Sequence, residues 1–372
     1  MAWVYFALMP TLPVYFINNL QISYRNVGLI MAAFSIAATL ARPISGYLID
    51  NFHRSGVLIV SLFLITVVCG IYPLLGTVST LFLLRFMHGA MWGIANTSSA
   101  PIVADIVPPS RMGQGIGIWA VTIPIGMTIG PMFGLGLLNA RGPNVMFLAV
   151  VGVSVLSVVG AFLARTPSKP VARRTFSVSS LFHAKALPVS YGMFFLMIAF
   201  GAIMIFVGIY ATQKGFSNVG GFFLCFAVAM FLSRLLSGRS FDKGHVFPLI
   251  LIGLALTAVG VLLLGYASAP MLFLAAGIAN GAGFGILMPT CQSAVNSLVK
   301  PNERGAANST YLISYDLGIG AGALIIGSLS DKVPLEVIYR YSIFLILLSA
   351  GILVFKAIPH YRRERQGDGA IP

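Results

Sequence analysis

The chain consists almost entirely of long apolar segments separated by short polar stretches. A helix that crosses a bilayer needs about 20 mainly apolar residues. The expected segments are 3–20, 26–50, 56–76, 79–106, 112–138, 145–164, 187–213, 218–240, 246–266, 269–298, 304–330 and 336–358. Charged residues make up only 9% of the 372 residues, against about 25% in soluble domains. The sequence therefore predicts an all-α polytopic membrane protein with twelve transmembrane helices. It excludes a soluble enzyme, a disordered chain and a nucleic-acid-binding protein.

An internal duplication relates the two halves of the sequence. A shift of 192 residues aligns Arg42 with Arg234 and Asp50 with Asp242 without a gap. The same shift aligns further glycines and prolines: Gly46 with Gly238, Gly89 with Gly281, Gly93 with Gly285, Pro109 with Pro301, Gly126 with Gly318, and Gly130 with Gly322. Duplicated six-helix halves are typical of transporters whose substrate site lies between the halves. The expected parts are an N-terminal six-helix bundle (1–164), a cytoplasmic linker (165–186), a C-terminal six-helix bundle (187–358) and a cytoplasmic tail (359–372).

The basic residues predict how the chain lies in the membrane. With the N-terminus inside, seventeen lysines and arginines fall on the cytoplasmic side and five on the outer side. Cytoplasmic loops carry this excess in membrane proteins, so we expect both termini in the cytoplasm and a bacterial inner-membrane location. This orientation signal explains the net charge of +14. Specific lipid binding is the alternative role for the basic linker and tail.

Two related motifs follow the second and eighth apolar segments. The first contains Gly46, Asp50 and Arg54, and its partial copy contains Gly238, Asp242 and Lys243. The glycine permits close helix contact, and the aspartate can cap a helix N-terminus, where partial positive charge favours an anion. The motif resembles the signature of the major facilitator superfamily. The resemblance implies that Asp50 and Asp242 are gate elements that hold the two halves closed on the cytoplasmic side. Alternatively, Asp50 is a plain turn residue.

The fourth segment carries an arginine well inside its apolar run. Arg85, His88, Trp92 and Asn96 are spaced three and four residues apart, which places them on one helix face. An arginine inside a membrane helix normally faces the bundle interior or a watery cavity. The segment resembles the arginine–glycine motif of proton-coupled facilitator antiporters, which implies a role in coupling or substrate contact. Alternatively, Arg85 extends to the outer interface, and His88 either titrates near neutral pH or is a satisfied interior histidine.

The fifth segment contains a run of small residues with a proline. Gly126, Gly130, Pro131 and Gly134 lie within nine residues of one expected helix. Small residues let membrane helices approach closely, and proline kinks them. In the superfamily this run is associated with antiporters, which are mostly exporters. We interpret the run as a helix-packing and conformational motif that does not contact the substrate.

Asp316 is the acidic residue placed deepest in an apolar segment. It lies about twelve residues into segment 304–330, hence ~18 Å along a helix at 1.5 Å per residue. Desolvation there favours the neutral carboxyl, whereas a cation such as Arg85 favours the carboxylate. Proton coupling or cation recognition is one role for Asp316, and a structural hydrogen bond is the other. Tyr311 and Tyr315 are the preferred cavity-lining candidates beside it. Other candidates are Tyr5, Asn18, Asn19, Trp119, Thr122, Tyr191, Tyr210, Asn280, Gln292 and Asn308.

These observations together predict a secondary active transporter of the major facilitator fold that works by alternating access. We expect proton-coupled efflux, or antiport, of a small organic or amphipathic molecule, by a monomer without cofactor or metal. A sugar or metabolite porter, working as a uniporter or symporter, fits the same scaffold. A non-transporting membrane sensor and a membrane-embedded hydrolase are more distant alternatives. The sequence contains no HExxH or GxSxG motif for hydrolysis and no nucleotide-binding GxxxxGK[ST] loop.

Overall fold

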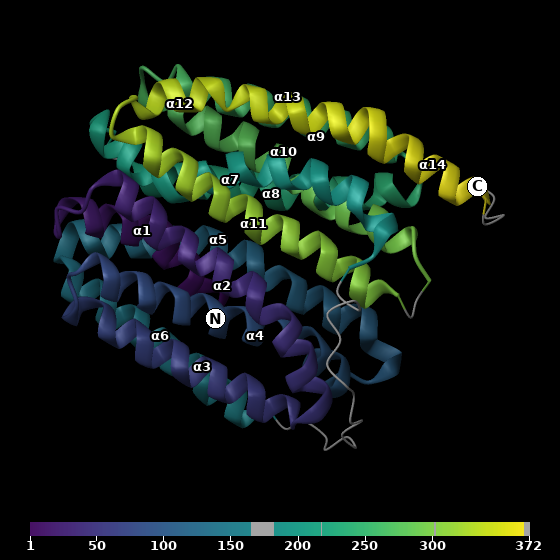
Figure 1. Cartoon of the computed structure of the whole chain (residues 1–372), viewed down its shortest axis with the longest axis horizontal. Coiled ribbons are helices and arrows are strands. Elements are labelled where there is room, and N and C mark those ends of the chain that lie inside the picture. Colours follow the sequence, from purple (N-terminus) through teal and green to yellow (C-terminus); the bar gives the residue numbers. More distant parts are fainter. Residues whose placement is uncertain (165–181, 217, 301–302, 368–372) are drawn as a thin grey trace. The chain divides into compact units, whose positions relative to one another are not determined.

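The computed structural model describes residues 1–164, 182–216, 218–300 and 303–367, which form helices and short connections without strands (Figure 1). The first half contains α1 (Ala2–Asn18), α2 (Tyr24–Asn51), α3 (Arg54–Ile71), η1 (Tyr72–Leu74), α4 (Val78–Ile106), η2 (Pro109–Arg111), α5 (Met112–Arg141) and α6 (Pro143–Leu163). The second half contains η4 (Ala184–Ala186), α7 (Leu187–Gln213), α8 (Val219–Asp242), α9 (Val246–Gly265), α10 (Pro270–Ser297), α11 (Arg304–Ser330), α12 (Leu335–Tyr341), α13 (Ile343–Ile352), η5 (Leu353–Ala357) and α14 (Ile358–Gly367).

The described helices match the expected membrane spans in number and kind. Eleven helical stretches are long and apolar enough to cross a membrane, and α1 adds a shorter apolar helix of 17 residues. The stretch from α12 to α14 counts as one span, Leu335–Glu364, and forms one nearly continuous rod in Figure 1. The structure thus confirms an all-α fold with twelve apolar helical segments. Helices α7 and α11 have the bounds that the sequence predicts.

The last helix extends beyond the span predicted from the sequence. The residues after Pro359, expected in a tail, remain helical as far as Gly367. Proline lacks an N–H and its ring clashes with the carbonyl four residues earlier. The wider π-turn η5 ends two residues before this proline, and such a turn relaxes the regular hydrogen-bond pattern. The π-turn therefore explains how the helix continues past Pro359.

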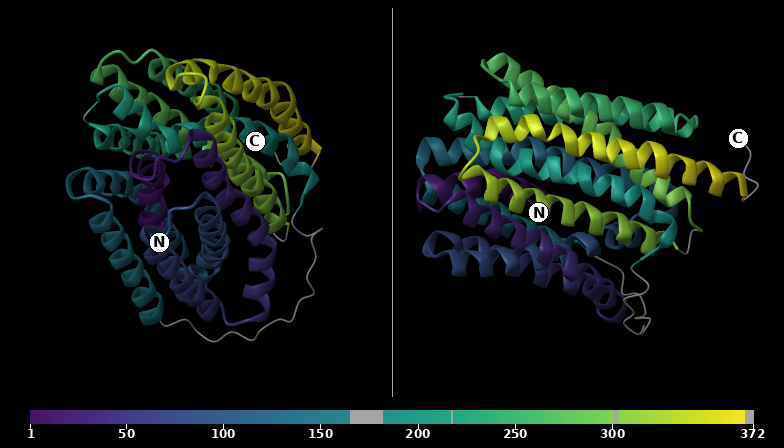
Figure 2. Two further views of the ribbon diagram at one scale, coloured as in Figure 1. Left: turned by 60° about the vertical axis from the view of Figure 1, so that its left-hand side comes forward. Right: turned by 45° about the horizontal axis from the view of Figure 1, so that its top comes forward.

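The chain divides into two compact units, Met1–Val178 and Ser179–Pro372. Most of the linker expected at 165–186 lies outside the described residues. In the first unit α2 packs on α4, α1 on α5, and α3 on both α4 and α6. In the second unit α8 packs on α10, α7 on α11, and α9 on α10 and α12. The helices of each unit run alongside one another in both views of Figure 2. Corresponding helices of the two units therefore pack against corresponding partners.

The duplication extends to individual contacts. Gly89 of α4 lies against the backbone of Phe34 in α2, and Gly281 of α10 lies against the backbone of Phe226 in α8. Each member of the second pair is 192 residues after its counterpart. A Cβ at either glycine would overlap the carbonyl oxygen that it faces. Only glycine permits these helix pairs to approach so closely, as in other small-residue membrane interfaces.

Candidate functional site

Arg85 is enclosed within the first unit. It occupies the eighth position of α4, and its side chain is among the largest that are fully buried, with 2% exposure. Its guanidinium carbon lies 4.4 Å from the centroid of the Phe34 ring, within the range of a cation–π interaction. Its Nε and Nη1 have no hydrogen-bond partner among the described residues. This burial does not fit a side chain that extends to the membrane surface.

Aromatic side chains from several elements pack together beside Arg85, and we call Tyr5, Phe34, Tyr72 and Trp92 the aromatic box. Tyr5 of α1 stacks on Trp92 with ring centroids 4.3 Å apart and on Phe34 at 5.2 Å. The Tyr72 hydroxyl lies 3.3 Å from Nδ1 of His88 and interacts electrostatically with Arg85. One ring face of the box, that of Phe34, thus lies against a permanent positive charge that is shielded from water.

The predicted helix face is present, but its four residues have different surroundings. His88 is fully buried and edge-on to Phe34, with ring centroids 5.3 Å apart. Its Nε2 has no partner among the described residues. Trp92 is half-buried within the box, and Asn96 is half-buried one turn further along α4. The residues Phe34 and Tyr72 were missed, because a helical spacing within one segment carries no information about side chains that other helices contribute.

The second unit lacks this buried cation at the corresponding place. Residues 192 positions after Arg85, His88 and Trp92 are Gly277, Asn280 and Phe284. Asn280 is fully buried, donates from Nδ2 to Ala276 O over 2.9 Å, and leaves Oδ1 without a partner among the described residues. The helix framework is therefore duplicated while the arginine site is specific to the first unit.

The second unit carries its own polar cluster around α11. Asp316 is the thirteenth of 27 residues in α11, is half-buried, and takes part in a polar or electrostatic interaction. Tyr311 is buried and donates its hydroxyl to Met288 O of α10 over 2.9 Å. The half-buried Tyr315 packs near Phe200 of α7, with ring centroids 6.1 Å apart. Asp316 thus lies at mid-helix, as predicted, and Tyr311 is anchored to a neighbouring helix.

Arg234 also belongs to this cluster. From the sequence alone, it served only to establish the internal repeat and the predicted membrane orientation. It lies in α8 and interacts electrostatically with Tyr311 and Tyr315. Its Nε is buried without a hydrogen-bond partner among the described residues. Its counterpart Arg42 is buried in α2. The signal was available, because the repeat aligns these two arginines and both precede the end of an apolar segment by several residues.

The first gate motif lies mostly within a helix. Gly46 and Asp50 belong to the last turns of α2, and Arg54 begins α3. Arg54 Nη1 lies 2.7 Å from Asp105 Oδ2 at the end of α4. The sequence placed Asp105 near a cytoplasmic helix end but did not predict its pairing with Arg54, although Asp105 and Asp50 are the only acidic residues before residue 165. The second copy places Gly238 and Asp242 in α8, with Lys243 as its C-cap. The side chains of Asp50 and Asp242 lie outside what the structure describes.

The glycine run of α5 forms the contact surface for α1. A Cβ at Gly126 would lie 2.9 Å from Ala2 C, one at Gly130 2.7 Å from Ala7 N, and one at Gly134 2.7 Å from Thr11 Oγ1. Pro131 lies within the same helix, as does Pro124. Corresponding glycines Gly318 and Gly322 of α11 lie against α7. These contacts are those of a packing surface.

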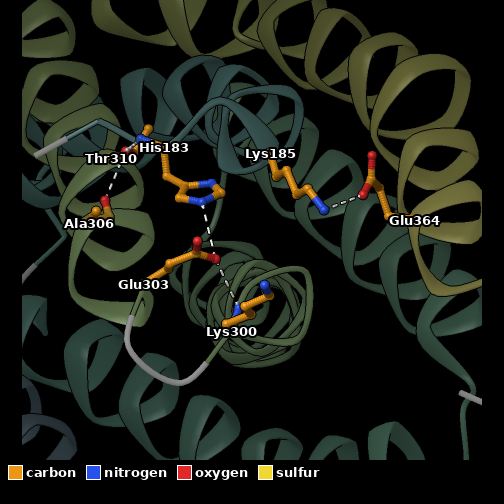
Figure 3. A network of polar contacts seen from close by, with 7 residues as sticks. All are labelled: His183, Lys185, Lys300, Glu303, Ala306, Thr310 and Glu364. Atoms are coloured by element: carbon orange, nitrogen blue, oxygen red, sulfur yellow. Dashed lines mark hydrogen bonds and ion pairs between the residues drawn. The ribbon is translucent and has the colours of Figure 1, made fainter. Parts of the chain in front are cut away.

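Polar contacts link the segment before α7 with the start of α11 and with the second half of α14 (Figure 3). His183 Nε2 lies 3.6 Å from Glu303 Oε2, and the His183 backbone N–H donates to Thr310 Oγ1 over 2.9 Å. Lys185 pairs with Glu364 at 2.5 Å. Among the described residues, no group of three or more histidine, cysteine, aspartate or glutamate side chains is placed to hold a metal ion. These contacts therefore connect the segment before α7 with α11 and α14.

Comparison with known proteins identifies the family. The sequence profile described as Major Facilitator Superfamily matches residues 1–251 and 219–371. The staphylopine export protein of Staphylococcus aureus is 22% identical over 328 residues, covering 84% of this chain and 82% of the relative. An uncharacterised MFS-type transporter of Methanocaldococcus jannaschii is 24% identical over 349 residues, covering 89% of each chain.

Solved structures agree with this assignment at the level of the fold. The nucleoside transporter NupG superposes with a TM-score of 0.74 at 15% identity, covering 95% of this chain and 96% of that one. The human organic anion transporter MFSD10 superposes with a TM-score of 0.68 at 19% identity, covering 95% and 96%. The chain belongs to the Major Facilitator Superfamily, a family of membrane transporters, and is an integral membrane protein.

Proposed function

We propose that this protein is a proton-coupled exporter of a small organic or amphipathic molecule that works by alternating access. The observation that carries the proposal is the pair of intramembrane charges at different places in the two units. Arg85 is buried beside the aromatic box, and Asp316 lies near the midpoint of α11. Ionisable groups at membrane depth are costly and mark ion or substrate pathways.

Asp316 is the proposed proton carrier. A carboxyl group in mid-membrane gains or loses its charge as water and cations gain or lose access to it. Tyr315 is its immediate neighbour on α11, and Arg234 interacts with Tyr315 from α8. This arrangement gives the substrate-facing part of the second unit a titratable anion, a fixed cation and aromatic surfaces. An amphipathic organic molecule can use all three.

Arg85 has a complementary role in the proposal. Its charge is permanent, and two of its nitrogens have no hydrogen-bond partner among the described residues. Incompletely satisfied donors are costly in a low-dielectric site, so a rearrangement that supplies an acceptor lowers the energy of the alternative state. Arg85 therefore biases a conformational equilibrium, while Asp50, Asp242 and the Arg54–Asp105 pair act at the gate.

Export is favoured by two independent features. The relative from Staphylococcus aureus is named an export protein, and the glycine run of α5 resembles that of antiporters. The proposed orientation has both termini in the cytoplasm of a bacterial cell and the protein as a monomer in its inner membrane. The proposed partners are the transported molecule, protons and the surrounding lipid. A sugar or metabolite porter on this scaffold is the second candidate, since the tyrosine and amide side chains of α10 and α11 also suit hydroxylated substrates.

The test is dye accumulation in bacterial cells that lack their own exporters. Cells with the wild-type protein should accumulate less dye, and a protonophore should abolish the difference. Asp316→Asn should behave like the empty vector at equal expression. Asp331→Asn is the matched control, because Asp331 is the exposed C-cap of the same helix, and it should retain transport.

The outcomes separate the candidate functions. Full activity of Asp316→Asn would overturn its role as proton carrier. Transport that resists the protonophore would overturn proton coupling. If the wild-type protein extrudes no dye, broad export is wrong, and substrate-induced proton movement in proteoliposomes with sugars and metabolites becomes the deciding measurement.

A further inference from the structure

A cavity of about 330 Å³ lies within the second unit, where α9 begins and α13 passes through η5 into α14. We call it the η5 cavity. Its wall is apolar except for His245, Tyr361 and Arg362. Val246 and Ile250 of α9 face it from one side, and Leu353, the first residue of η5, faces it from another. Its volume is within the range of small-molecule binding sites.

The π-turn η5 forms part of the cavity wall through Leu353 and Ala357. Leu353 packs so tightly on α7 that a Cβ at Gly192 would lie 2.5 Å from it. Ser349 Oγ also donates to Gly192 O over 2.8 Å. These contacts hold the end of α13 and the start of η5 against α7, and η5 continues into α14. Single π-turns in helices are frequent at functional sites.

Charge is distributed unevenly around the cavity. Arg362 lies at its wall with the guanidinium carbon 5.6 Å from the Phe247 ring centroid. Lys243 immediately precedes the lining residue Gly244, and Lys356 immediately precedes the lining residue Ala357, and both lysines are exposed. The nearby Glu364 is already paired with Lys185. Arg362 and His245 therefore form a basic edge of an otherwise mostly apolar cavity.

The surrounding surface is suited to lipid. On α9 the side chains of Leu251 and Ile252 are exposed, and on the last rod Leu348 and Phe355 are exposed. Such apolar residues on helices long enough to span a bilayer face acyl chains. The proposed orientation places the start of α9 and all of α14 at the cytoplasmic leaflet, which carries anionic lipids and attracts basic residues.

We propose that the η5 cavity binds an anionic phospholipid of the cytoplasmic leaflet, with one acyl chain in the cavity and the headgroup phosphate at Arg362 and His245. The apolar wall excludes a free inorganic anion as the main occupant, because such an ion would lose its hydration there. The basic edge favours an anionic over a zwitterionic headgroup. This site is independent of the transported substrate.

The first experiment measures lipid binding to the full-length protein in detergent micelles by native mass spectrometry. Phosphatidylglycerol and phosphatidylethanolamine with identical acyl chains are compared. Phosphatidylglycerol should bind more tightly, and Arg362→Ala should weaken its binding about fivefold, the effect of one basic residue at an anionic membrane surface. Arg363→Ala is the matched control, because Arg363 is exposed on the same helix and does not line the cavity.

Three outcomes would overturn the proposal. Equal affinity for the two lipids would show that the site does not select an anionic headgroup. Equal losses in Arg362→Ala and Arg363→Ala would show a general surface-charge effect. Displacement of the lipid by millimolar inorganic phosphate would indicate a soluble anion as the occupant.

A second experiment locates the acyl chain without any substitution. Phosphatidylglycerol with a photoactivatable diazirine on one acyl chain is crosslinked to the wild-type protein, and the labelled peptides are sequenced. Labels on Val246, Ile250 or Leu353 are expected, since these residues line the cavity. Labels confined to outward residues such as Leu251 and Phe355 would show lipid on the surface only and would refute insertion.

Discussion

Arg54 and Asp105 join the first turn of α3 to the last turn of α4 through an ion pair with an N–O distance of 2.7 Å. The Asp105 side chain is 8% exposed and that of Arg54 is 34% exposed. Arg54 Nε also donates to Ile49 O of α2 over 3.4 Å. One side chain from the signature motif therefore connects three helices of the first unit.

We expect Arg54→Gln and Asp105→Asn each to slow transport by about two- to fivefold, because a partly exposed ion pair contributes up to about 1 kcal/mol. The double variant should lose little more than either single one. Transport rates in proteoliposomes, arranged as a double-mutant cycle, measure this coupling. Additive losses in the double variant would mean that the pair does not act as a unit.

Arg85→Lys should fold less stably than the wild-type protein, although it keeps the charge. Lysine cannot lay a planar guanidinium over Phe34, and a desolvated cation–π contact contributes about 2 kcal/mol. The expected result is a lower midpoint of thermal unfolding in detergent together with impaired transport. Arg141→Lys is the control, because Arg141 is exposed at the end of α5. Unchanged stability of Arg85→Lys would show that the aromatic box does not depend on the guanidinium plane.

Gly89→Ala and Gly281→Ala should each destabilise the protein by about 1–3 kcal/mol, the usual cost of overpacking. The obstacle in both cases is a backbone carbonyl, at Phe34 and at Phe226, which cannot move aside as a side chain can. Gly152→Ala is the control, since a Cβ there meets nothing within 4 Å and alanine favours helix formation. Thermal unfolding of the three purified variants is the measurement, and equal midpoints for all three would be inconsistent with the packing.

Tyr311→Phe should reduce stability by about 1 kcal/mol, because the buried Met288 carbonyl loses its hydrogen-bond donor. Its substrate KM should remain unchanged if the hydroxyl serves only this bond. Tyr315→Phe is the matched comparison, since Tyr315 lies one turn away and is half-buried. We expect Tyr315→Phe to raise the substrate KM with little effect on the unfolding temperature. If Tyr311→Phe raised the substrate KM and Tyr315→Phe lowered the unfolding temperature, Tyr315 would be the structural residue and Tyr311 the substrate contact.

The sequence predicted the helices better than the site. Hydropathy alone located α7 and α11, because a membrane span imposes a nearly fixed length of apolar chain. Helical spacing correctly placed Arg85 and His88 on one face. It did not predict Phe34 or Tyr72 beside them, since contacts between helices depend on how each helix is rotated about its axis. The Arg54–Asp105 pair was missed for a similar reason, as 51 residues separate its partners.

The close approach of Gly89 to Phe34, repeated by Gly281 and Phe226, has a consequence for the history of the chain. A gene duplication copies both partners of such a contact at once. Each half therefore inherits the same distance between its two helices, which is set by a glycine and a backbone carbonyl. Positions beside the contact were then free to diverge. Arg85 and Gly277 occupy the same place in the two copies, and this divergence allowed one ancestral bundle to give rise to two halves with different chemistry.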